Sequence, residues 1–270
     1  MKLIKQSFQF VNQKGFTLKD IYKHIEYCAR ISYKSQDRIT DDSYEKFVSM
    51  LINREHDRPL EFGTIHLLTN YKGFIDLQEA LLSAKMYNDQ WLHYEEVDEN
   101  LVYITTNYRY YLAMVKVFPW IASYLDESDS KYYPKRYTVH MVLSRGVMDE
   151  FRTHIGLSYL AESTRYCSYN KDKFGNEVTF IEPCWEIRGT NYIDYLQEAE
   201  KGYFHLLDMG WKPQQARSVL PLGIKSELIS CGFEDAWSNF FLRRCASDAH
   251  PMAQEIAKPM HEEYLNLIKC

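Results

Sequence analysis

The sequence predicts an α+β fold in which helices pack on a mixed or antiparallel sheet. Apolar residues recur at three- and four-residue steps in several long segments, which is typical of amphipathic helices. Between them lie short segments whose apolar residues alternate, and these predict strands. The segments do not follow a regular strand–helix alternation, and no glycine-rich turn opens the chain. Both observations argue against a doubly wound nucleotide fold.

In the first part of the chain, helices are expected at 17–33, 41–54, 77–86 and 108–125, with strands at 63–68 and 102–105. Leu18, Ile21 and Ile25 carry the spacing of the first helix. The acidic pair Asp41 and Asp42 precedes the second, where negative charge favours a helix start.

In the second part, strands are expected at 136–143, 178–181 and 224–230, with helices at 144–154, 192–207, 213–219, 235–246 and 252–267. Tyr137, Val139 and Met141 alternate along the first of these strands. Ser144 is a suitable N-cap for the helix that follows, and Gly156 a suitable stop. We find no internal repeat or linker and expect a single domain over 1–270.

Composition narrows the class of protein. The 270 residues are 46% hydrophobic and 26% charged, as in a soluble globular protein. The net charge of −5 offers no overall basic field for a nucleic acid polymer. The polar N-terminus lacks the apolar run of a signal peptide, and no segment is apolar for long enough to cross a membrane. The six cysteines form no Cys-x-x-Cys pair, so we expect free thiols in a reducing, cytoplasmic setting.

The segment 150–166 concentrates the polar chemistry. Glu150 and His154 are four residues apart and share a helix face. If the chain is extended further on, Ser163 and Arg165 point the same way, and a hydroxyl beside a guanidinium suits a phosphate. The alternative is a solvated turn with a local Glu162–Arg165 pair, and the residues alone leave the two readings about equally favoured.

Other polar groups occur in weaker contexts. Arg217 lies in an expected helix that ends at Pro221. Arg244 is seven residues after Trp237 and is therefore expected near the same face of its helix. Taken singly, each arginine is more simply read as an ordinary surface or snorkelling side chain. The segments 56–63 and 105–109 are polar stretches beside expected strands. The nine histidines show no metal-ligand spacing, so no metal site is predicted.

Taken in order, these pieces resemble the flavin-dependent thymidylate synthases, from about Ala29 to about Ala257. The matching pieces are Ala29-Arg30-Ile31-Ser32-Tyr33, Pro59-Leu60-Glu61, Thr106-Asn107-Tyr108-Arg109, Arg145-Gly146, Glu162-Ser163-Thr164-Arg165-Tyr166, Ala216-Arg217 through Leu220-Pro221, and Trp237 through Pro251. Members of that family convert dUMP to dTMP with 5,10-methylenetetrahydrofolate, FAD and NADPH. They form homotetramers whose active sites are shared between subunits.

The resemblance implies roles for individual residues. The substrate-binding set would be Glu150, Glu162, Ser163, Arg165, Arg217 and Arg244. Arg244 would also be catalytic, because a fixed cation stabilises charge that develops on the uracil ring. The cofactor-binding set would be Ser32, Glu61, Arg109, His154 and Asn239.

The chain departs from the family on the flavin side. The family signature is Arg-His-Arg, then seven residues, then Ser; here it reads Thr153-His154-Ile155, seven residues, then Ser163. Arg152 lies one residue before the first arginine position of that signature, and on a helix it would point about 100° away from that position. Phe62 stands where the family usually has a histidine that approaches the flavin.

Three functions follow as hypotheses. The first is reductive methylation of dUMP or a close pyrimidine nucleotide, with an altered FAD site. The second is a flavin-independent transfer that leaves a hydroxymethyl group on the nucleotide. The third is a non-catalytic, nucleotide-binding paralogue.

Overall fold

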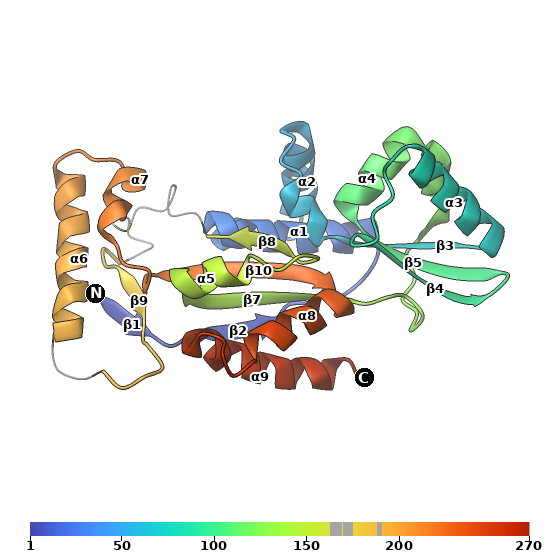
Figure 1. Ribbon diagram of the computed structural model, residues 1–270. Coiled ribbons are helices and arrows are strands. Elements are labelled where there is room, and N and C mark those ends of the chain that lie inside the picture. Colours follow the sequence, from blue (N-terminus) through green and yellow to red (C-terminus); the bar gives the residue numbers. More distant parts are fainter. Residues whose placement is uncertain (163–168, 170–174, 188–190, 270) are drawn as a thin grey trace.

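The computed structural model describes residues 1–162, 169, 175–187 and 191–269. Its centre is a four-stranded antiparallel sheet in the order β2-β7-β10-β8 (Figure 1). The strands are β2 (Ser7–Phe10), β7 (Arg136–Ser144), β10 (Lys225–Phe233) and β8 (Ser158–Ala161). The longest pairing joins β7 to β10 over their whole length, from Ser144 opposite Lys225 to Arg136 opposite Phe233.

The two faces of this sheet are covered by different helices. On one face, α5 (Arg145–Phe151), α8 (Glu234–Arg244) and α9 (Pro251–Leu267) pack against the alternating apolar residues of β7. On the other, α1 (Leu18–Tyr33) places Cys28 and Ile31 against Leu160 and Ile229. Because side chains alternate along a strand, each strand contributes to both layers.

A second sheet extends from this centre in the order β4-β5-β3-β6. Its strands are β4 (Leu92–Asp98), β5 (Leu101–Asn107), β3 (Thr64–Thr69) and β6 (Leu125–Asp126). The helices α2 (Ser43–Asn53), α3 (Tyr71–Ser83) and α4 (Tyr108–Val117) share its apolar core with α1. A short 3₁₀ helix, Arg58–Phe62, leads into β3.

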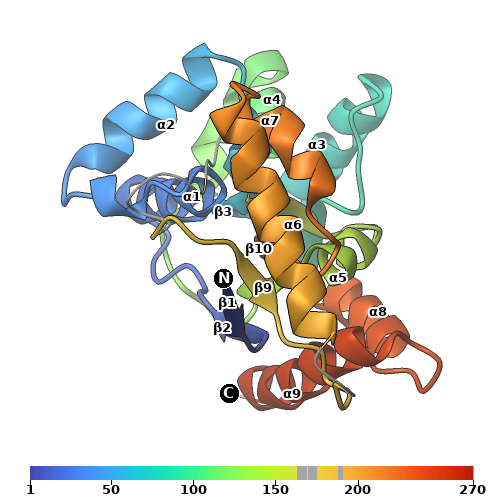
Figure 2. The same cartoon turned by 90° about the vertical axis from the view of Figure 1, so that its left-hand side faces the viewer.

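The N-terminus takes part in a third, smaller unit. The strand β1 (Lys2–Ile4) pairs in parallel with β9 (Thr179–Ile181), and α6 (Asn191–Asp208) and the short α7 (Pro213–Ala216) pack nearby (Figure 2). The described residues therefore form an α+β architecture, in which both four-stranded sheets are antiparallel, β1 and β9 are parallel, and helices pack on the sheets, as the sequence predicted.

Most predicted elements are present, with shifted ends. The helix predicted at 108–125 breaks at Phe118 because Pro119 cannot continue the hydrogen-bonding pattern, and a 3₁₀ helix, Pro119–Tyr124, follows. The helix predicted at 144–154 ends at Phe151, where the Thr153 hydroxyl donates to the carbonyl oxygen of Glu150. Gly156 does follow it, with φ of +88°.

Two further corrections concern helix starts and short strands. The helix predicted at 77–86 begins earlier, at Tyr71, because the Asn70 side chain accepts a hydrogen bond from the Gly73 amide. The sequence did not predict β1, β2, β4 or β8, which depend on pairing with distant strands. No helix within the described ranges is long and apolar enough to cross a membrane.

Candidate functional site

Arg244 is the centre of the first polar cluster, at the end of α8. Its Nε donates to His154 Nε2 at 2.7 Å, and its Nη1 donates to Glu150 Oε2 at 3.0 Å. Its Nη2 donates to the Glu150 carbonyl oxygen at 2.7 Å and to Thr153 Oγ at 3.2 Å. A guanidinium has five N–H groups. Among the described residues, one N–H of Nη1 is left for a ligand.

His154 is held neutral in this arrangement. Burial, together with the charges of Arg244 and Arg243, lowers the pKa of His154 to about 4. A neutral imidazole can accept the hydrogen bond from Arg244, whereas an imidazolium could not. Three predicted residues, Glu150, His154 and Arg244, thus meet in one place although they come from α5, the loop after it and α8.

A second cluster surrounds Glu162, on the opposite face of the central sheet. Lys225 Nζ donates to Glu162 Oε2 at 2.9 Å and to Glu227 Oε1 at 2.6 Å. Lys34 also pairs with Glu227 and lies 3.7 Å from Glu162 Oε2. His140 Nε2 lies 3.0 Å from Glu227 Oε2. All five side chains are largely buried, so they form a low-dielectric ionic network.

The pKa values of the charged groups in this network depend on burial and on the oppositely charged partners of each group. Burial alone would raise the pKa of Glu227, but His140, Lys225 and Lys34 hold it well below its usual range. Burial lowers the pKa of Lys34. For Lys225, burial is outweighed by Glu162 and Glu227, and the pKa is raised.

Four residues of this network were not predicted from the sequence: Lys34, Lys225, Glu227 and His140. One signal was available, since Lys225 and Glu227 are two residues apart at the edge of an apolar strand and must point to the same face. Lys34 and His140 carried no comparable signal.

A cavity of about 600 Å³ opens beside the network. Glu162, Lys34 and Lys225 line it, together with Lys2 and Tyr169. Ser163 and Arg165 follow Glu162 directly in the sequence but lie outside the described residues. The amide of Glu162 donates to the carbonyl oxygen of Glu227 at 2.7 Å, so the end of β8 is tied to β10 where the predicted phosphate-binding segment begins.

The predicted cofactor residues are engaged within the fold. Glu61 is buried; its Oε1 accepts from Arg109 Nη1 at 2.6 Å and its Oε2 from Ser158 Oγ at 2.7 Å. The Ser32 hydroxyl donates to the Ala29 carbonyl oxygen at 2.7 Å. Glu61, Arg109 and Ser158 therefore brace the 3₁₀ helix before β3 against β8 and α4.

The remaining predicted residues lie apart from one another. Asn239 is exposed on α8, although the helix also carries Arg244. Arg217 is half-buried and follows α7, beside the apolar cluster that contains Ala216. Within one chain, the structure thus gathers Glu150, His154 and Arg244, and places Glu162 and Glu61 on the opposite, α1-facing side of the central sheet.

The departures from the flavin signature have structural consequences. Thr153 is part of the Arg244 cluster, and Ile155 is 72% exposed. Phe62 is fully buried and packs with Cys28, Ile31 and Leu160. Arg152 lies 3.8 Å from Asp149 rather than beside His154. Thr153 and Ile155 carry no positive charge. They therefore cannot pair with an anionic pyrophosphate as two arginines flanking His154 would.

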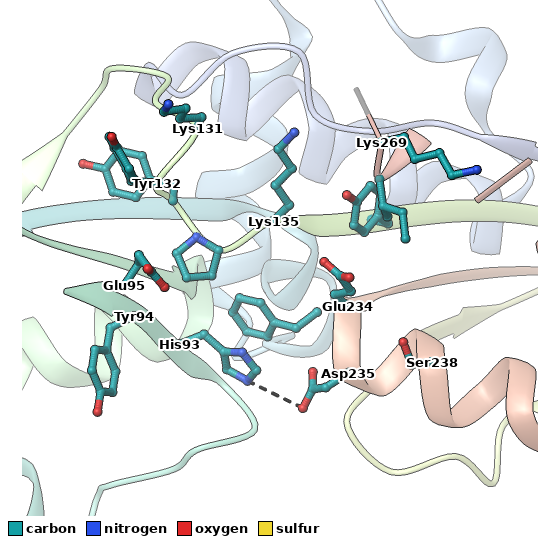
Figure 3. A pocket seen from close by; sticks show the side chains of 15 residues that line it. His93, Tyr94, Glu95, Lys131, Tyr132, Lys135, Glu234, Asp235, Ser238 and Lys269 are labelled. Atoms are coloured by element: carbon teal, nitrogen blue, oxygen red, sulfur yellow. Dashed lines mark ion pairs between the residues drawn. The ribbon is translucent and has the colours of Figure 1, made fainter. Parts of the chain in front are cut away.

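A wider cleft of about 1010 Å³ lies between β4, the loop before β7 and the start of α8 (Figure 3). His93 stacks on Phe233 and lies 4.0 Å from Asp235, while three exposed lysines, Lys131, Lys135 and Lys269, occur around its rim. None of the predicted site residues lines this cleft. Across the described ranges, no three His, Cys, Asp or Glu side chains gather as a metal site.

The chain is similar to solved structures of other proteins, although no curated protein sequence matches it. A search of curated protein sequences found no match. Among solved structures, the chain is similar to the UMP/dUMP methylase PolB from Streptomyces cacaoi bound with 5-Br dUMP, at 15% identity and a TM-score of 0.46, over 99% of this chain and 93% of that chain. The same methylase bound with 5-Br UMP gives 14% identity and a TM-score of 0.46, over 99% and 92% of the two chains.

The match to a family model covers the part of the chain that builds β7, α5, β8, β10, α8 and α9. It spans residues 135–267, and the family is described as thymidylate synthase complementing protein. Every residue predicted to bind the nucleotide falls within this range, whereas Ser32, Glu61 and Arg109 lie before it. Residues 135–267, just under half of the chain, are thus similar to the thymidylate synthase complementing protein family.

Proposed function

We propose that the protein binds dUMP or a close pyrimidine nucleotide and transfers a one-carbon unit from 5,10-methylenetetrahydrofolate to its base. The observation that carries the proposal is that the family match contains Glu150, Glu162, Ser163, Arg165, Arg217 and Arg244, the whole predicted nucleotide-binding set. The two UMP/dUMP methylase structures concern nucleotides of the same chemical class.

In the proposed reaction, Arg244 faces the uracil ring with its remaining N–H. Glu150 and His154 hold the guanidinium in one orientation through three of its hydrogen bonds. A fixed cation needs no reorientation when negative charge develops on a ring oxygen, and this is the condition for electrostatic catalysis. Ser163 and Arg165 would grip the phosphate, and Arg217 would add a second cationic contact.

The ionic network supports this site indirectly. Lys225 and Lys34 hold Glu162, the residue immediately before the proposed phosphate grip. We assign them a positioning role, because buried charges paired in this way fix the start of the segment that follows.

The two polar clusters lie on opposite faces of the central sheet. A site composed of both would require a second copy of the chain, with Arg244 from one subunit and Ser163 and Arg165 from another. We therefore propose a homotetramer with shared active sites, and light scattering of the purified protein tests this directly.

The carbon transfer forms a bond between C5 of the base and the methylene carbon, breaks both bonds from that carbon to the folate nitrogens N5 and N10, and releases the C5 proton. A methyl product also needs a hydride, which FAD reduced by NADPH supplies in the family. Since Thr153, Ile155 and Phe62 do not fit the family's flavin contacts, no step is assigned to flavin through them. The same observation favours a second candidate, in which water completes the reaction and a hydroxymethyl group results.

Calorimetry with dUMP and mass spectrometry of the product test the proposal. The expected result is dUMP binding and a product that carries one added carbon when methylenetetrahydrofolate, FAD and NADPH are present. A methyl group selects the first candidate, and a hydroxymethyl group without added flavin selects the second. Binding without any product would identify a non-catalytic paralogue, and the absence of dUMP binding would refute the proposal.

A further inference from the structure

A basic pocket of about 720 Å³ lies between the end of α1 and α2, outside the family match. Four Lys and Arg side chains line it, and Asp37 is the only acid among the lining residues. The whole chain, by contrast, carries a net charge of −5. The pocket thus concentrates positive charge on an acidic protein.

The cations of this pocket fall into two groups. Arg30 is bound to Glu26 Oε1 at 2.7 Å, and Lys34 pairs with Glu227, so both have their charges compensated. The side chains of Arg38, Arg54 and His56 form no hydrogen bond or ion pair with the described residues. An arginine fork without a carboxylate partner remains available to a phosphate or another anion.

The walls of the pocket are suited to an organic ligand. Arg30 lies over the Phe47 ring at 4.5 Å, and Met50 and Tyr33 add further apolar surface. A volume near 720 Å³ far exceeds the needs of a simple anion and falls in the range of sites for small organic molecules. Cations and aromatic surface that line the same pocket fit a ligand that joins a charged group to a ring.

The backbone turns sharply at two places beside this pocket. Lys34 and Glu55 both adopt left-handed backbone conformations, with φ of 51° and 54°. They end α1 and follow α2, so each turns the chain at a rim of the pocket. Non-glycine residues adopt this conformation at a cost, and such residues gather at functional sites.

The pocket also adjoins the cavity beside Glu162, because Lys34 and Asp37 line both. We propose that it binds the diphosphate group of an organic ligand through Arg38 and Arg54, with the ligand's ring against Phe47 and Met50. Arg38 and Arg54 would then provide the positive charge that the family's two signature arginines carry, and that Thr153 and Ile155 lack. The proposal does not depend on the identity of the nucleotide at Glu162.

Calorimetry with the full-length protein tests this site. The probes are ADP, FAD and NADPH, which carry a diphosphate, and tetrahydrofolate, which does not. At least one diphosphate probe should bind, and its affinity should fall with added salt, as expected for exposed ionic contacts. Arg38→Gln and Arg54→Gln should each weaken binding roughly tenfold or more, because each removes charge-assisted hydrogen bonds.

Lys46→Gln is the matched control, since Lys46 is an exposed cation on α2 that does not line the pocket. It should bind the probe as the unaltered protein does. Circular dichroism and thermal melting of each variant verify that the fold is retained, and Arg54→Lys should restore only part of the affinity because it lacks the planar fork.

The proposal is overturned if no diphosphate probe binds, or if the Arg38 and Arg54 variants bind every diphosphate probe normally. Weakened binding of tetrahydrofolate alone would also show that the ligand class is wrong. Binding of dUMP, measured in parallel, reports on the proposed function, so the failure of one proposal is distinguishable from the failure of the other.

Discussion

The Nε of Arg244 donates a hydrogen bond to Nε2 of His154 at 2.7 Å, across a separation of 90 residues in the sequence. The contact requires a neutral imidazole, and burial beside two arginines provides it. One residue predicted as a catalytic cation and another predicted as a flavin contact are therefore partners in one hydrogen-bonded group.

Replacing Arg244 should damage both stability and nucleotide binding. Arg244→Gln removes the charged partner of Glu150 and leaves His154 without its donor. We expect the free energy of unfolding to fall by about 2–3 kcal/mol, the scale of charge-assisted hydrogen bonds, and dUMP affinity to fall roughly tenfold or more. Denaturant titration and calorimetry measure the two effects. Arg243→Gln, at the exposed neighbouring position, should change neither; equal behaviour of the two variants would contradict the assigned role.

Stability should decline as the pH falls from about 6.5 to about 4. The pKa of His154 is near 6.5 when the chain is unfolded and about 4 in the fold, so the unfolded state binds more protons between these values. Burial lowers the pKa of His66 to about 4 and that of His24 to about 3, with the same sign. Thermal melting across this pH range should show a shallower decline for His154→Gln. If the exposed-site variant His205→Gln flattens the curve equally, the attribution to His154 is wrong.

The ionic network should be sensitive to the loss of one partner. Lys225→Met leaves the buried Glu162 and Glu227 with Lys34 as their remaining lysine, and removing one member of a buried pair costs about 3–5 kcal/mol. Lys225→Arg keeps the charge and should retain most of the stability. Lys201→Met breaks an exposed pair with Glu198 and should have little effect on urea unfolding. Similar losses for Lys225→Met and Lys201→Met would show that the network is not a buried unit.

If the positioning role is correct, Lys225→Arg and Lys225→Met should also differ in KM for the nucleotide. The Met variant should raise KM more than it lowers kcat, because it removes a partner of Glu162, which directly precedes the segment proposed to bind the phosphate. Unchanged KM in a folded Lys225→Met protein would mean that the network serves stability alone.

Restoring the family's usual histidine at position 62 should destabilise the protein. Phe62 is fully buried among Cys28, Ile31 and Leu160, where an imidazole would be desolvated and would fill less volume. We expect Phe62→His to cost about 2–4 kcal/mol, and Phe62→Leu, which stays apolar, to cost less. Guanidinium titration provides the comparison. A stable Phe62→His protein with a gain in FAD affinity would show that this position still faces a flavin site.

The local sequence determined the elements with strong periodicity or clear caps. The alternation of Tyr137, Val139 and Met141 predicted β7, and Ser144 predicted the start of α5, because these signals depend on neighbouring residues. Pairing partners far away in the sequence decided β1, β2, β4 and β8, whose short lengths carry little pattern of their own.

The same division applies to the site. The order of the motifs along the chain was sufficient to indicate the family and to name Glu150, His154 and Arg244. Only the tertiary structure showed that these three meet, since α5 and α8 are brought together by the strands between them. It also decided that Glu162 is held by Lys34 and Lys225 on the other face of the sheet: a strand's alternation tells which residues share a face, but not which distant charges will lie opposite them.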